Sequence, residues 1–291
     1  TTVCGALKEA LKDVQNDLGI FVCGGKGATS RKTPFEIEAL AEKRLINADA
    51  EKLKYASRMS AKVDNTAIQD GYQLYHHTFI VDKNGKWAVI QQGMNENTKW
   101  ARRYHWLGDE VSDFVVEPHK AICCDQKNEN TLNLVAKESS GAREVCGKLS
   151  CDTPEKTVKE YSRILELKMP SYHDVKQRDI LPKNLKKILI TTYENKPENF
   201  EKLLGIQGVG PGTVRALALV SELVYGEKPS FQDPVRFSFA HGGKDGFPYP
   251  VNRPRYDGTI SFLQDAVSKA KVGDSEKMKA LKRLTVFSGT K

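Results

Sequence analysis

The chain has 291 residues, of which 39% are hydrophobic and 28% are charged, and its 45 basic and 37 acidic residues give a formal net charge of +8 at pH 7. This composition is that of a folded globular protein and excludes a wholly disordered chain. No apolar run approaches the roughly 18 residues that a membrane-spanning helix needs, so we expect no membrane partner.

The positive excess lies almost entirely in the second half of the chain. Residues 1–150 hold 21 basic and 20 acidic residues, whereas residues 151–291 hold 24 and 17. A local basic excess is typical of proteins that bind an anionic partner, and nucleic acid is the commonest one. We therefore expect nucleic-acid contacts in the second half, and we look for chemistry in the near-neutral first half.

The first predicted elements are a helix, a short strand and a glycine-rich turn. Apolar residues recur at helical spacing over residues 7–18, and Gly19 is a natural helix end. Ile20–Cys23 predicts a buried strand, which leads into a Gly-Gly-Lys-Gly run at residues 24–27. Such a turn can direct amides at a phosphate, with Lys26 adding charge. Its spacing is not that of a Walker A loop, and a plain flexible turn is the alternative.

Two helices are predicted next from their start signals. Thr33 and Glu36 have the spacing of a capping box, and Pro34 occupies the first helical position. A second helix is expected to begin at Asp49. Asp64, together with the later Asp70, then places two carboxylates just before the predicted sheet.

Residues 72–93 predict a β-hairpin of two strands around the Asn-Gly pair at positions 84 and 85, the strongest short hairpin signal. With those two residues as the turn, His77 pairs with Gln92 at the end of an apolar face, where a catalytic group is partly desolvated. His76 points to the opposite face, because side chains alternate along a strand. A structural histidine is the alternative for His77.

Residues 101–106 interleave arginines with aromatic residues, a combination that binds phosphate and stacks on bases. If the segment is extended, Arg103 and His105 share one face, while Tyr104 and Trp106 pack on the other. A half-buried strand with one polar face is the alternative.

The six cysteines are expected to be reduced thiols, because the opening segment is amphipathic and charged rather than secretory. A zinc site combining them with His119 is a weaker hypothesis, since their spacing matches no common zinc pattern.

The most specific pattern in the chain spans residues 200–217 and resembles a helix-hairpin-helix, in which a glycine-rich turn joins two helices. The glycines permit a tight turn, and the amides of the turn and of the following helix start donate to a phosphate oxygen without reading sequence. Val209 anchors the turn in the core. A plain packing unit or a protein contact is the alternative. The residues expected to form this phosphate site are Gly208, Val209, Gly210, Gly212 and Thr213.

Asp233 lies about as far beyond the hairpin as the essential aspartate of helix-hairpin-helix DNA glycosylases, which this part of the chain resembles. Gly212 stands where bifunctional members carry a lysine. A turn or helix cap at Asp233, which precedes a proline, is the alternative.

Several unusual strings are spread along the chain: Gly5–Glu9, Gly24–Gly27 with Thr33-Pro34, Leu74–His77, Trp87–Asn95, Ala101–Trp106, Glu117–His119, the hairpin and Phe239–Val251. By these strings the whole chain resembles the archaeal and bacterial family called "domain of unknown function 763". The resemblance implies a cytoplasmic prokaryotic protein with a nucleic-acid module, and no settled activity. Family members have a further segment before the position that corresponds to Thr1. We expect that the present chain lacks this segment.

These patterns predict an α+β protein with two domains. A mixed α/β domain with a β-hairpin is expected over residues 1–150, and an all-helical domain over residues 151–291, with the helix-hairpin-helix at about 197–226. The leading functional hypothesis is a DNA-binding, metal-dependent nuclease in DNA processing or repair. A Mg²⁺ or Mn²⁺ ion on Asp64, Asp70 and His77 would activate water.

In the same hypothesis, His77 or His105 moves protons, with Gln92 beside His77, while Lys26, Arg102 and Arg103 hold the scissile phosphate. A non-catalytic nucleic-acid-binding module and a DNA glycosylase are the alternatives. DNA is a more probable partner than RNA on these patterns, and a homodimer or a protein partner is also possible.

Overall fold

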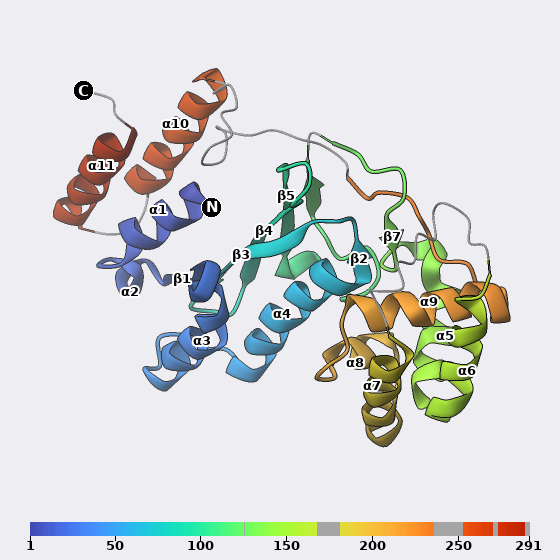
Figure 1. Cartoon of the computed structure of the whole chain (residues 1–291). Coiled ribbons are helices and arrows are strands. Elements are labelled where there is room, and N and C mark those ends of the chain that lie inside the picture. The colour runs from blue at the N-terminus through green and yellow to red at the C-terminus, as the bar shows by residue number, and fades with distance from the viewer. Residues whose placement is uncertain (125, 168–180, 236–252, 270–272, 289–291) are drawn as a thin grey trace.

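The structure is a computed structural model, and it describes residues 1–124, 126–167, 181–235, 253–269 and 273–288 (Figure 1). At its centre is a five-stranded antiparallel sheet in the order β1-β3-β4-β5-β6. These strands are Ile20–Lys26, Gln73–Asp82, Trp87–Met94, Ala101–Leu107 and Ala121–Cys123. A two-stranded sheet pairs β2 (Ile68–Gln69) with β7 (Leu132–Asn133). The predicted α+β class is confirmed.

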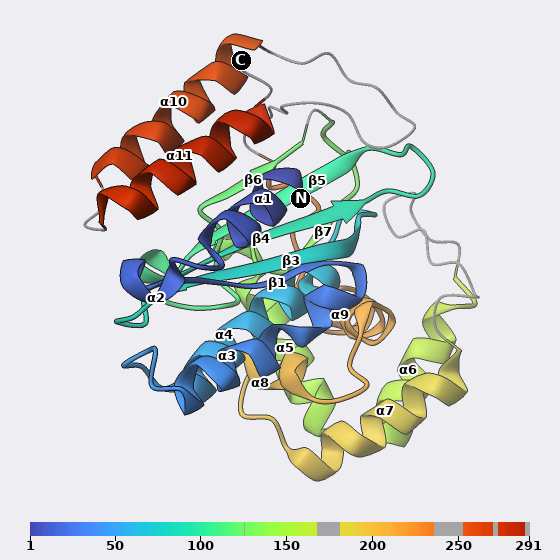
Figure 2. The same cartoon turned by 90° about the vertical axis from the view of Figure 1, so that its left-hand side faces the viewer.

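Helices cover both faces of the large sheet. The inner face packs against α3 (Thr33–Glu42) and α4 (Ala50–Lys62), and buries Phe79, Val81 and Val89 completely. The outer face carries α1 (Thr2–Leu11), with α10 (Arg253–Lys269) and α11 (Asp274–Ser288) beyond it, as Figure 2 shows. The apolar core of the described sheet therefore lies on its inner face.

The second helical group forms around α9 (Pro211–Tyr225), which is buried along most of its length. It packs with α5 (Ser140–Cys151) and α6 (Pro154–Ile164), and α5 also contacts α7 (Pro182–Asn195) and α8 (Phe200–Gly205). Its buried residues belong to the same hydrophobic cluster as those of the sheet. The helical group thus already includes α5, which ends at the predicted boundary near residue 150, and it shares one core with the sheet.

The remaining elements are short. They are α2 (Gln15–Leu18), the 3₁₀ turns Gly27–Lys32, Gly108–Glu110 and Lys137–Ser139, and the π-turn Val63–Ala67. None of the described helices is both long and apolar enough to cross a bilayer. All six cysteines are free thiols, as predicted.

Local start and stop signals give mixed outcomes. Gly19 ends α2 in the left-handed conformation (φ 63°), and Asp49 caps α4 by accepting from two backbone amides, as expected. The predicted capping box is wrong: the Glu36 carboxylate instead accepts from Lys8 Nζ and from the Gly24 amide. The glycine-rich turn also differs, because β1 continues through it to Lys26 and the Gly24 amide is already occupied.

The β3–β4 hairpin forms as predicted, but with a three-residue loop instead of a two-residue turn. Asp82 and Lys86 are joined by a backbone hydrogen bond of 2.9 Å, and Asp82 Oδ1 accepts from the Asn84 amide inside the loop and from the Lys86 amide at its end. Gly85 supplies the left-handed residue (φ 88°) that such loops require. Pairing therefore shifts by one residue. The predicted His77–Gln92 pair is wrong: His77 lies opposite Gln91, and Gln92 lies opposite His76.

We predict that Gly85→Ala destabilises the fold more than Gly226→Ala. Both glycines have positive φ, which costs an alanine about 1–2 kcal/mol. Only at Gly85 would the new Cβ also collide, at 2.5 Å from Ala48 Cβ, whereas Gly226 has open space. Urea unfolding of both variants measures the difference. Equal losses would show that the loop relaxes away from Ala48.

Candidate functional site

Asp64 lies at the centre of a buried hydrogen-bond chain on the inner face of the sheet. One of its oxygens binds His119 Nε2, and the other accepts from Gln91 Nε2 and from Trp106 Nε1 (3.0 Å). The chain continues from Gln91 Oε1 to His77 Nδ1 at 3.0 Å, and from His77 Nε2 to the Ser57 hydroxyl at 2.9 Å. It contains two of the predicted catalytic residues, Asp64 and His77.

The direction of each hydrogen bond in this chain follows from the Asp64 carboxylate, which can only accept. Gln91 must therefore turn its amide nitrogen toward Asp64 and its oxygen toward His77. The His77 Nδ1 atom then carries the proton, and its Nε2 accepts from Ser57. Burial lowers the pKa of His77, against the opposing effects of Gln91 and Asp64. The chain is saturated and buried, so it stabilises the core.

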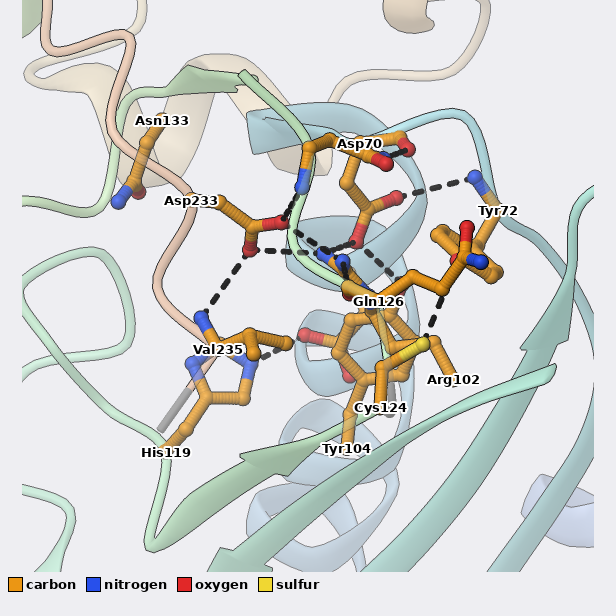
Figure 3. A network of polar contacts seen from close by, with 12 residues as sticks. Asp70, Tyr72, Arg102, Tyr104, His119, Cys124, Gln126, Asn133, Asp233 and Val235 are labelled. Carbon is orange, nitrogen blue, oxygen red and sulfur yellow. Dashed lines mark hydrogen bonds and ion pairs between the residues drawn. The ribbon is translucent and has the colours of Figure 1, made fainter. Parts of the chain in front are cut away.

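A second buried network surrounds Arg102 (Figure 3). Its two terminal nitrogens donate to both oxygens of Asp233, at 2.9 and 2.7 Å, and one of them also donates to Asp70 at 2.9 Å. Asp70 further accepts from the Tyr104 hydroxyl at 2.6 Å and from the Tyr72 amide at 3.0 Å. The side chains of Arg102 and Asp233 have no exposed surface, and that of Asp70 has 1%.

The electrostatics of this network keep Arg102 charged. Burial acts to lower its pKa, but Asp70 and Asp233 outweigh burial and the net change is upward. Burial raises the pKa of Asp70, against Arg102 and Tyr104. Two carboxylates share one guanidinium, and backbone amides at Tyr72, Asn128 and Val235 complete their hydrogen bonding. The predicted phosphate ligand Arg102 is therefore enclosed by protein groups, and so is the proposed glycosylase aspartate, Asp233.

The predicted metal ligands Asp64, Asp70 and His77 are divided between these two networks. Within the residues that the structure describes, no group of three or more His, Cys, Asp or Glu side chains is placed to hold a metal ion. Hydrogen bonds to protein donors occupy both oxygens of Asp64 and of Asp70. The donor set as predicted does not fit a divalent ion.

Four other residues that the sequence predicted lie on the outer face of the sheet: Lys26, Gln92, Arg103 and His105. Register places Lys26, His76, Gln92, Arg103 and Cys123 directly opposite one another on five adjacent strands. We call Lys26, His76, Gln92 and Arg103 the outer row. His105 lies on the same face, two residues along β5 from Arg103. The sequence pattern predicted correctly that Arg103 and His105 share a face and that Tyr104 and Trp106, both buried, share the other.

The outer row is partly covered by the start of the chain. The Thr1 amino group donates to Gln92 Oε1 at 3.3 Å, and His76 Nε2 lies 2.9 Å from the Thr78 hydroxyl. Burial lowers the pKa of His76 to about 4, with help from the Thr1 amine, His77 and Lys26. Burial, then Arg103 and His119, lowers the pKa of His105.

The predicted hairpin of the second half is an exposed turn between α8 and α9. Gly208 adopts φ 90° and is exposed, while Val209 is fully buried, as its anchoring role requires. Helix α9 starts at Pro211, so Gly212 and Thr213 lie in its first turn, after an N-cap glycine (Gly210) that provides no side-chain cap. The neighbouring leucines at 203, 204, 217 and 219 are all buried, as predicted.

Gln91 and His119 are the network residues whose roles the sequence did not indicate. A three-residue loop would have placed Gln91 opposite His77, so the wrong loop length hid it. His119 lies in one of the unusual strings, Glu117–His119, which is the only signal that singled it out beside the weak zinc pattern. The predicted polar string at Phe239–Val251 lies entirely outside the described residues.

We predict that Arg102→Met destabilises the protein by about 3–5 kcal/mol, because it leaves two buried carboxylates without their cation. Lys86→Met is the matched control, since it breaks an exposed pair with Asp109 (2.9 Å), and exposed ion pairs contribute little to stability. Denaturant unfolding compares the two variants. Similar losses would contradict the role assigned to Arg102.

We predict that stability falls as the pH drops from 6.5 toward 5. His76, His77 and His105 all have lowered pKa values in the fold, whereas the unfolded chain binds their protons below about 6.5. As the pH falls, the unfolded state therefore binds protons at these histidines that the folded state does not bind. Unfolding free energies measured across this range should decline less steeply in His76→Gln. An unchanged slope in that variant would show that His76 is protonated in the fold.

Comparison with known proteins places the chain in a family. No curated protein and no solved structure gives a significant match. The family model described as "protein of unknown function (DUF763)" matches residues 1–251, a span that includes both buried networks, the outer row and the α8–α9 turn. The chain belongs to this family.

Proposed function

We propose that the chain binds the phosphate backbone of nucleic acid through the turn and helix start at residues 208–213, which resemble a helix-hairpin-helix. The observation that carries the proposal is the exposed, uncapped start of α9. Gly208 and Pro211 are exposed, and among the described residues no side chain caps the amides of this helix start, although the Gln69 amide donates to the Pro211 carbonyl at 2.8 Å. The first amides of a helix have no carbonyl partner within it, and the helix dipole favours an anion there. A phosphate oxygen would satisfy the amides of Gly212 and Thr213.

The surrounding charges support an anion at α9 rather than at α8. The first turn of α9 has no acidic residue, whereas α8 is capped by Asn199 and carries Glu201 in its first turn. Lys62 brings a positive charge to the turn by donating to the Val209 carbonyl at 2.8 Å. These features give the start of α9 a positive potential. The start of α8 is already capped, so its amides are less available to an anion.

Helix α7 adds further positive charge beside the turn. A side chain on Gly208 would lie 3.9 Å from Ile188 Cγ1, so this part of α7 borders the turn. Lys187, the residue before Ile188, is exposed. An exposed lysine next to an uncapped helix start is the kind of arrangement that positions a phosphate backbone without reading bases.

The geometry supports backbone binding better than hydrolysis by the predicted metal set or base excision at Asp233. The groups that those two hypotheses need are buried and occupied by protein donors. Backbone binding needs only surface features that the turn provides. Since such contacts reach phosphates and not bases, we propose binding without sequence preference, to DNA in the first instance.

We predict that Gly210→Leu weakens DNA binding while leaving the fold intact. Gly210 has an extended backbone, and a Cβ there would meet nothing closer than 4.0 Å, so the leucine covers the amides without strain. Gly258→Leu is the control, because it adds the same side chain in open space on α10. Fluorescence anisotropy with labelled duplexes of two unrelated sequences should show an equal loss for both sequences.

The salt dependence of the same assay tests the kind of contact. Log affinity should fall linearly with log salt concentration, by about 0.9 for each neutralised phosphate of a duplex. Unchanged binding in Gly210→Leu, or binding that does not respond to salt, would contradict the proposal. Incubation of the same duplexes with Mg²⁺ or Mn²⁺ measures strand cleavage separately from binding.

A further inference from the structure

The carboxyl end of α4 lies beside the turn between α8 and α9, as Figure 1 and Figure 2 both show. The π-turn Val63–Ala67, which follows α4, contacts both α8 and α9. Lys62, the last residue of α4, donates from Nζ to the Val209 carbonyl at 2.8 Å. That carbonyl carbon is bonded to the nitrogen of Gly210, the N-cap of α9. A charge from α4 is therefore held at the start of α9.

Lys62 is a half-buried cation whose charge is not balanced by a carboxylate. Among the described residues, its ammonium is hydrogen-bonded to the Val209 carbonyl and forms no ion pair. An ammonium group has three donors, so two remain after this hydrogen bond. Burial lowers the pKa of Lys62. Because an ionic interaction is stronger where water is partly excluded, a cation in this position attracts an anionic ligand more strongly than a fully hydrated one does.

Arg58 stands one helical turn before Lys62, and residues four apart are neighbours on the surface of a helix. It is exposed, and its side chain has no hydrogen bond or ion pair with any other described residue. Lys54, a further turn back, differs because it is paired with Glu38 and Glu51. We call Arg58 and Lys62 the α4 pair. Its members are about 6 Å apart along the helix axis, which is close to two nucleotide steps of a duplex strand at about 3.4 Å each.

We propose that the α4 pair extends the phosphate site, so that duplex nucleic acid crosses from the start of α9 onto α4. This inference rests on the function proposed for the turn, and it names the form of nucleic acid that the site takes. One phosphate occupies the start of α9, and the α4 pair contacts the neighbouring phosphates of the same strand. Charge-assisted hydrogen bonds to these phosphates add affinity, and they read no bases.

The chemistry of this surface favours a duplex over a single strand. Proteins that bind single strands without sequence preference combine a basic groove with aromatic side chains on which the bases stack. Neither the turn at residues 207–213 nor the α4 pair contains an aromatic residue. Tyr55, three residues before Arg58, has its ring packed against Phe114 and beneath the ammonium of Lys202. A duplex presents phosphates with its bases already stacked, which matches the groups that this surface offers.

Arg58→Gln tests the extension, because no contact within the described residues depends on this side chain. Binding of a labelled duplex is followed by fluorescence anisotropy over a range of salt concentrations. We expect weaker binding and a slope of log affinity against log salt that is smaller by about 0.9, the value for one lost phosphate contact. Lys52→Gln is the matched control, because it removes one exposed charge from α4 about 9 Å further back along the axis. Equal slopes in the two variants would overturn the proposal.

Two variants of Lys62 separate contact with the ligand from support of the turn. Lys62→Met removes the charge and the hydrogen bond to Val209, and it should reduce the salt slope by the same amount as Arg58→Gln. Lys62→Arg keeps the charge and should restore the slope. If Lys62 only holds the turn in place, Lys62→Met would lower the affinity and leave the slope unchanged. That result would overturn its place in the α4 pair.

The same assay distinguishes failure of this inference from failure of the proposed function. Lost binding in Gly210→Leu with an unchanged slope in Arg58→Gln would retain the proposed function and overturn the extension onto α4. Unchanged binding in Gly210→Leu would overturn both. A single strand of the same sequence and length should bind more weakly than the duplex, and equal or tighter binding of the single strand would overturn the assignment to a duplex.

Discussion

The buried guanidinium of Arg102 determines how the segment after α9, which carries Asp233, packs against the sheet. A cation without exposed surface must be surrounded by acceptors, because an unpaired buried charge costs several kcal/mol. Asp70 accepts from one terminal nitrogen, Asp233 accepts from both through two parallel hydrogen bonds, and the Gln126 carbonyl accepts from Nη2, while Nε has no partner among the described residues. Asp233 is 131 residues away in sequence and lies in the segment that follows α9. The segment carrying it is also held by Asn128 and Asn133. The placement of α9 beside the sheet thus depends on a charge in strand β5.

Signals confined to a few residues predicted elements well. Gly19 and Asp49 act within one turn of a helix, so their effects can be read without knowledge of the fold. The strand pairing of the hairpin, by contrast, was predicted wrongly by one residue. An Asn-Gly pair locates a turn, but the Asp82 side chain accepts from the Asn84 and Lys86 amides and favours a loop one residue longer. Since side chains alternate, that one residue exchanged Gln92 for Gln91 beside His77.

The sequence indicated the residues of the candidate sites one by one, but it did not show which of them lie together in the fold. Lys26, Gln92, Arg103 and His105 were each chosen for their chemistry, and the sheet gathers all four on its outer face. Arg102 was chosen for the same reason as Arg103, yet it points inward and is fully buried. Side-chain alternation along the strand shows that Arg102 and Arg103 point to opposite faces. Only the interaction with Asp233, far along the chain, decides which of the two is enclosed. Pairings of such separation leave no local pattern.

The near-neutral charge of the first half does not report how its charged groups are placed. Arg102 and Arg103 are adjacent in sequence, but alternation along β5 puts Arg102 on the inner face, where Asp70 and Asp233 enclose it, and Arg103 on the outer face opposite Gln92. Asp64 is likewise enclosed by protein donors. A count over residues 1–150 averages over all these positions. The potential that a ligand meets is set by nearby groups within a Debye length, about 8 Å at physiological ionic strength, so it follows from the placement of single side chains and not from the net charge of the half.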